Sequence, residues 1–106
     1  MMTIVYNKLV RDNIPKIIEA AGKKCSTEIL PDDIYLQLVD AKLDEELAEY
    51  HKDQNIEELA DLLEVIRAAT LARGYTLEDL ERVRAAKAEK RGSFEKKILL
   101  KEVYED

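Results

Sequence analysis

The chain has 106 residues, which is enough for one domain with a modest hydrophobic core. Its net charge of −6 argues against a general nucleic-acid binder, and its single Cys25 cannot form an internal disulfide. No apolar run is long enough to span a membrane, and the N-terminus lacks the apolar core of a signal peptide. We therefore expect one domain over residues 1–106 of a cytoplasmic protein that binds neither nucleic acid polymers nor membranes.

The first predicted elements are a short undefined segment and a short helix. Residues 2–10 have alternating and β-branched character but are too few to distinguish an extended segment from a loop. Asp12 or Asn13 can then cap a helix that has Pro15 in its first turn, where the missing N–H costs nothing. Gly22 suits the left-handed backbone position that ends such a helix.

The remainder of the chain is predicted to be mainly helical, because Gly and Pro are scarce and Leu, Ala, Glu and Lys are abundant. Three further helices are expected: one from Asp32 or Asp33 to about His51, one from Asn55 or Ile56 to about Arg73, and one that follows Thr76 and ends at Gly92. Residues 24–30 and 94–103 have strand character and can pair as a small two-stranded ribbon. The predicted fold is therefore an all-α, antiparallel helical bundle, with or without that ribbon.

Charge is unevenly distributed along the chain. Residues 1–30, 31–66 and 67–106 carry net charges of +2, −10 and +2, respectively. An acidic centre between two mildly basic ends can bind a metal ion in the middle and an anion at the ends. A solvated acidic pair of helices would show the same pattern, and charge alone does not separate the two interpretations.

The spacing of four acids in the centre predicts a metal site. Glu46 and Glu49 lie one turn apart on one expected helix, and Glu58 and Asp61 lie one turn apart on the next. If the polar break at residues 51–55 folds the second helix back, all four carboxylates converge. Converging carboxylates repel unless a cation lies between them, and Mg²⁺ prefers oxygen ligands of this kind. We expect Mg²⁺ here, with Mn²⁺ as the alternative.

Chance and helix capping would also place acids at these positions. With 38% charged residues, the chain can show Glu-x-x-Glu by chance, and Glu58 also stands at the third helical position after Asn55, where it would help to cap a helix. The metal interpretation is favoured because the acids border the apolar stripes of their helices. Acids at such borders lose more hydration than acids that face water.

Three short motifs in this order resemble a known family. KLDEELAE at residues 42–49, followed by ELAD at residues 58–61, is similar to the Glu-Glu-x-x-Glu and Glu-x-x-Asp motif of the MazG-like, all-α nucleoside triphosphate pyrophosphohydrolases. YNKLVRDNIP at residues 6–15 and KRGSFEKKIL at residues 90–99 look like the ends of a phosphoribosyl-ATP pyrophosphohydrolase-like subgroup. The subgroup more often has Gly-Gly where this chain has Gly-Ser.

The resemblance implies a helical homodimer or homotetramer that cleaves a nucleoside triphosphate between its α and β phosphates, with the removal of unwanted nucleotides as its expected role. Carried over by position, the metal ligands are Glu46, Glu49, Glu58 and Asp61. Glu45 matches an additional acid that binds metal or orients the attacking water, and Glu45 or Glu49 would take the proton from that water.

Basic side chains should hold the phosphates of the substrate. The candidates are Lys8, Arg11, Lys42, Lys87, Lys90 and Arg91, most of which lie in the two basic ends of the chain. Each of them is equally well explained as a solubilising surface charge.

Two alternatives to this function remain. One is a true phosphoribosyl-ATP pyrophosphohydrolase of histidine biosynthesis, which would use the same chemistry on another nucleotide. The other is a non-enzymatic module whose acidic helical face binds a basic partner protein and requires no metal.

Overall fold

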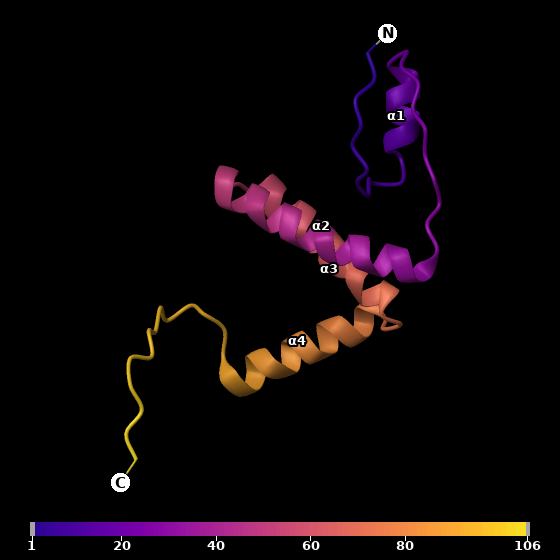
Figure 1. The fold of residues 1–106 in the computed structure, drawn as a ribbon. Coiled ribbons are helices and arrows are strands. Elements are labelled where there is room, and N and C mark those ends of the chain that lie inside the picture. Colours follow the sequence, from indigo (N-terminus) through magenta and orange to yellow (C-terminus); the bar gives the residue numbers. More distant parts are fainter. Residues whose placement is uncertain (1, 106) are drawn as a thin grey trace. The chain divides into compact units, whose positions relative to one another are not determined.

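The computed structural model describes residues 2–105, and within them all regular secondary structure is helical, without a strand (Figure 1). The helices are α1 (Ile14–Ala20), α2 (Asp32–Asp53), α3 (Ile56–Ala72) and α4 (Leu77–Arg91). The prediction of an all-α fold is confirmed. The chain divides into two compact units, one up to Tyr75 and one from Thr76 onward. None of the helices in the described residues has the length and apolar character of a membrane span.

The short helix α1 follows the predicted pattern with one difference. Pro15 lies in its first turn, and Gly22 after it has a φ of 82°, the left-handed conformation that glycine adopts without strain. Asn13 occupies the N-cap position, but its side chain forms no capping hydrogen bond. The start of α1 is therefore set by Pro15 rather than by a side-chain cap.

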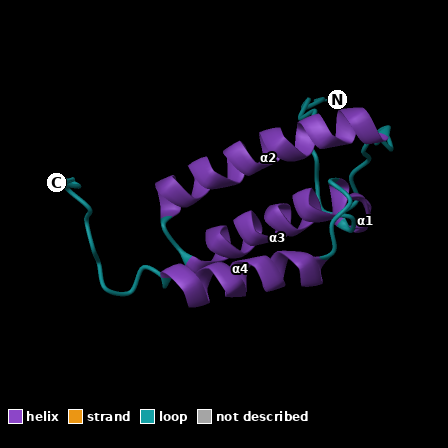
Figure 2. Cartoon of the chain, turned by 90° about the horizontal axis from the view of Figure 1, so that it is seen from below, coloured by secondary structure: helices purple, strands orange, loops and turns teal. Residues whose placement is uncertain are grey.

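Helices α2 and α3 form an antiparallel hairpin and lie side by side (Figure 2). The turn between them is short because Gln54, with a φ of 50°, ends α2 and Asn55 begins α3. The Asn55 side chain accepts a hydrogen bond from the Glu58 backbone N–H at 3.0 Å, which is the predicted N-cap. Val39 of α2 is only 1% exposed, and it is the one fully buried side chain among the described residues. The hairpin is the element that brings the central acids together.

The second unit consists of α4 and the tail that follows it. The helix follows Thr76, as the sequence predicts, and Thr76 and Asp79 form a reciprocal capping box with hydrogen bonds of 3.0 Å and 2.9 Å. Gly92, with a φ of 81°, lies at the other end of the helix.

The predicted ribbon of residues 24–30 and 94–103 is wrong. Neither segment forms a strand, and the two belong to different units. Phe94 and Leu99 are 97% and 81% exposed, so the apolar side chains that suggested a strand have no sheet face to pack on. Strand propensity mainly reflects such packing, and without it the segments have no regular structure.

Candidate metal centre

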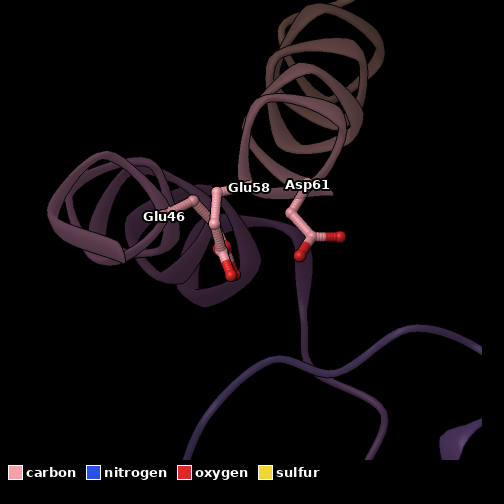
Figure 3. Close-up of side chains that lie close together, drawn as sticks. All are labelled: Glu46, Glu58 and Asp61. Carbon is pink, nitrogen blue, oxygen red and sulfur yellow. The ribbon is translucent and has the colours of Figure 1, made fainter. Parts of the chain in front are cut away.

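Carboxylates from α2 and α3 converge in two overlapping groups. The first consists of Glu46, Glu58 and Asp61, and the second of Glu49, Asp53 and Glu58. Within each group, one oxygen of every carboxylate lies within 4.8 Å of one oxygen of each of the others. Figure 3 shows the first group, in which the side chains from the two helices point to the same side of the hairpin. Glu58 belongs to both groups and lies at their centre.

Local sequence features explain this convergence. Glu46, Glu49 and Asp53 are spaced by three and four residues, so they share one face of α2. The turn at Gln54 reverses the chain, and the Asn55 cap fixes where α3 begins, which places Glu58 in the first turn of α3. Asp61, one turn further along, extends the same face. The four acids that the sequence selected are therefore divided between two groups that share Glu58.

The electrostatics of Glu58 show that the site has an excess of negative charge. Partial burial of its carboxyl raises the pKa of Glu58, and repulsion from Asp61, Asp53, Glu49 and Glu46 raises it further. Both effects disfavour the charged carboxylate that a metal ion would require as its ligand. A cation placed between these acids would reverse the balance, because it would attract every one of them.

The donor set fits Mg²⁺. This ion takes oxygen ligands at about 2.1 Å, so two ligand oxygens on opposite sides of it are about 4.2 Å apart. Neighbouring ligand oxygens of an octahedral ion are only about 3.0 Å apart, and at least two of the three oxygen pairs in each group would be neighbours. Spacings of up to 4.8 Å would therefore have to close by as much as about 1.8 Å, through rotation of the carboxylate side chains. All five of these side chains are partly buried or exposed, which leaves room for the water ligands that Mg²⁺ usually retains.

Asp53 is the member of the site that the sequence analysis missed. The polar run beginning at His51 suggested that α2 ends there, which would place Asp53 in a loop. The structure instead continues α2 through Asp53, so this side chain shares the face of Glu49. The absence of Gly or Pro before Gln54 was the available signal, since only those residues strongly interrupt a helix.

Three of the predicted phosphate-binding residues contact acids at this site. Lys8 Nζ lies 3.2 Å from Glu45 Oε1, and Lys42 Nζ lies 3.3 Å from Glu45 Oε2 and 3.5 Å from Glu46 Oε1. Arg11 Nη2 lies 2.6 Å from Asp61 Oδ1. The basic start of the chain thus folds onto the acidic hairpin.

Glu45 differs from the other acids because two lysines neutralise it. Partial burial alone would raise the pKa of Glu45, but the hydrogen bonds and positive charges of Lys8 and Lys42 outweigh that effect and lower it. Glu45 belongs to neither group of converging carboxylates within the described residues. Its contacts indicate that it positions these lysines.

The other three candidates lie on α4 in the second unit. Lys87, Lys90 and Arg91 line one shallow hollow of this helix together with Arg82. The structure therefore brings these three predicted residues together on one basic face. Such a face attracts anions, although surface charges with no ligand have the same appearance.

Comparison with known proteins gives little more. No protein-family profile matches the chain, and no solved structure matches it. A protein of Mycolicibacterium smegmatis, described only as uncharacterized, is 52% identical to the chain over 42 residues. The match covers 40% of this chain and 43% of that relative, so the chain spans less than half the length of the protein that it matches. The function therefore has to be inferred from the residues and their geometry.

Proposed function

We propose that this protein is a cytoplasmic, Mg²⁺-dependent nucleoside triphosphate pyrophosphohydrolase of the MazG-like type, with Mn²⁺ as an alternative metal. It would cleave between the α and β phosphates and release a nucleoside monophosphate and pyrophosphate. The observation that carries the proposal is the convergence of acids from α2 and α3 around Glu58, whose pKa is raised by burial and by their repulsion. The resemblance of the two acidic motifs supplies the reaction class.

The acids of the hairpin would hold the metal. Glu46, Glu58 and Asp61 form one set of oxygen donors, and Glu49, Asp53 and Glu58 form a second. When bound there, Mg²⁺ would neutralise the acids, polarise the phosphate oxygens and lower the pKa of a bound water. The substrate is itself strongly anionic, so this neutralisation has to precede its binding.

Glu49 is the better candidate for the general base. A base must be able to accept a proton, and the two lysines that lower the pKa of Glu45 make that carboxylate less basic. Glu49 lies among the converging acids and is exposed, so an attacking water can reach it. We therefore assign proton removal to Glu49 and the positioning of Lys8 and Lys42 to Glu45.

Two separate groups of basic side chains are candidates for holding the phosphates. Lys8, Lys42 and Arg11 already lie at this site, where they can turn from a carboxylate to a phosphate group. Lys87, Lys90 and Arg91 are retained as candidates on the basic face of α4.

The proposed enzyme is a homodimer or homotetramer. Ile56, Leu59, Leu63 and Ile66 recur at intervals of three and four residues on α3, yet they are between 36% and 72% exposed. An exposed apolar stripe with this spacing is typical of a face that packs against another helix. Light scattering coupled to size-exclusion chromatography should give the mass of two or four chains, and the mass of a single chain would refute this part of the proposal.

The proposed reaction is tested by following pyrophosphate and orthophosphate release from a panel of nucleoside triphosphates and phosphoribosyl-ATP, with Mg²⁺ or with a chelator. Metal-dependent release of pyrophosphate from nucleoside triphosphates is the expected result. A strong preference for phosphoribosyl-ATP would instead indicate the enzyme of histidine biosynthesis. No release from any substrate, by folded protein, would refute the enzymatic function and favour an acidic interaction module.

A further inference from the structure

Arg11 forms an ion pair with Asp61, whose carboxylate is one of the proposed metal ligands. Its Nη2 lies 2.6 Å from Asp61 Oδ1, and this is the ion pair that Arg11 forms within the described residues. We propose, resting on the function given above, that Arg11 is a built-in counter-ion which a divalent cation displaces from Asp61. The released guanidinium then binds a phosphate group of the anion that enters the site.

The exchange follows from the charges involved. The Asp61 carboxylate attracts both a divalent cation and a guanidinium, and two cations held at one carboxylate repel each other. Without a metal, Arg11 partly neutralises a site in which Glu58 experiences the charges of four other acids. With a metal bound, that neutralisation is no longer needed. Each cation therefore weakens the binding of the other at Asp61.

The structure lets Arg11 move without unfolding its surroundings. Its side chain is 58% exposed and that of Asp61 is 41% exposed, so the pair is accessible to solvent. The Arg11 backbone is held in place, because its carbonyl accepts a hydrogen bond from the Ile14 N–H at 3.0 Å. Exposed side chains change rotamer within nanoseconds, so the exchange requires no movement of a helix.

The neighbouring contacts keep the basic segment in place during the exchange. Until an anion enters the site, Lys8 remains paired with Glu45, which belongs to neither group of converging acids and would not bind the metal. Leu9 is half-buried, and together with Leu38 of α2 it lines a small open hollow of about 70 Å³. Arg11 would therefore remain next to the site after it leaves Asp61.

The test compares metal binding by matched variants of the full chain in the absence of nucleotide. Arg73 is a suitable control, because it forms a similar pair with Asp40 at 2.9 Å, with side-chain exposures of 55% and 53%. Calorimetric titration with Mn²⁺ should show about two- to fivefold tighter binding by Arg11→Gln than by the wild type, the range expected from one exposed ion pair. Arg73→Gln should bind Mn²⁺ as the wild type does.

A double-mutant cycle separates the specific pair from a general change in charge. In an Asp61→Asn background, the additional Arg11→Gln substitution should leave the Mn²⁺ affinity nearly unchanged, because the contested carboxylate is gone. At saturating Mg²⁺, Arg11→Gln should bind inorganic pyrophosphate about tenfold more weakly than the wild type, since a charged hydrogen bond is lost. Circular dichroism of each variant verifies that the helices are intact.

The outcomes distinguish this inference from the proposed function. Unchanged or weaker Mn²⁺ binding by Arg11→Gln would overturn the exchange while leaving the metal site intact. An equal gain in Arg73→Gln would also overturn it, because the effect would then be one of net charge. Unchanged pyrophosphate binding would refute the second half of the inference. Absence of Mn²⁺ binding by the wild type would refute the metal site itself, and the exchange with it.

Discussion

Replacing Asn55 with Ala should affect both the stability of the hairpin and its metal affinity. The substitution removes the side-chain oxygen that accepts a hydrogen bond from the Glu58 N–H at 3.0 Å. Loss of an N-cap of this kind costs about 1 kcal/mol. For a unit of this size, that loss should lower the midpoint of thermal unfolding by about 4–8 °C.

The same substitution should weaken metal binding, because the freed first turn of α3 carries Glu58. If the whole of that roughly 1 kcal/mol appears as fraying of the turn, the Mg²⁺ affinity should fall by at most about fivefold. Differential scanning calorimetry measures the first effect and isothermal titration measures the second. Asn55→Ser, which retains a capping oxygen, should remain close to the wild type in both.

Thr76→Ala is the matched control for this prediction. Thr76 caps α4 through an equivalent hydrogen bond of 3.0 Å from the Asp79 N–H, but α4 belongs to the second unit and carries none of the converging acids. Its removal should leave the metal affinity unchanged. The reasoning would be refuted if Thr76→Ala weakened metal binding as much as Asn55→Ala does, or if Asn55→Ala changed neither stability nor affinity.

Two further predictions concern individual acids. Asp53→Asn should reduce Mn²⁺ affinity about tenfold, as expected for the loss of a group that holds or supports the metal. Asp44 is an exposed acid of the same helix outside both groups, so Asp44→Asn should keep the wild-type affinity. Equal affinities of the two variants by calorimetry would exclude Asp53 from the site. Because the pKa of Glu58 is raised above its ordinary value of 4.5, the folded protein binds the proton of the Glu58 carboxyl more tightly than the unfolded chain does. Metal-free protein should therefore lose this contribution to its stability as the pH rises through the raised pKa. Urea unfolding from about pH 4 to pH 7 should show that the wild type loses stability relative to Glu58→Gln; acids with a lowered pKa, such as Glu45, contribute stability that rises with pH in both proteins. Mg²⁺ affinity should increase over the same range, and an identical pH dependence in both proteins would contradict the assignment.

Much of the hairpin could be predicted because its signals are local. The Asn55 cap depends on residues within three positions of each other, and the structure has it. The same holds for Thr76, which stands at the start of α4 as predicted. The pairing of Glu46 with Glu49, and of Glu58 with Asp61, follows from helical periodicity. The hairpin itself was expected from the polar break between the two apolar helical patterns.

What could not be predicted depends on tertiary structure or on where α2 ends. Gln54 adopts a left-handed backbone, which its residue type does not specify, so the helical state of Asp53 remained hidden. The pairs between Lys8 and Glu45 and between Arg11 and Asp61 span 37 and 50 residues, and no local pattern indicates them. The prediction of a strand in the tail was wrong because it relied on local apolar residues, and in the structure these side chains are exposed and have no neighbouring strand.

The central claim is that the acidic hairpin catalyses metal-dependent release of pyrophosphate. The most direct measurement compares the rate of this release in the wild type, Glu49→Gln and Glu57→Gln, at saturating Mg²⁺ and with the best nucleoside triphosphate of the panel. Glu57 is the matched control, because it is an exposed acid in the first turn of α3 that belongs to neither converging group. Loss of the general base should reduce the rate of Glu49→Gln by about 10²–10⁴-fold, while Glu57→Gln should retain the wild-type rate. Equal rates in all three proteins, or release that persists with a chelator, would contradict the account.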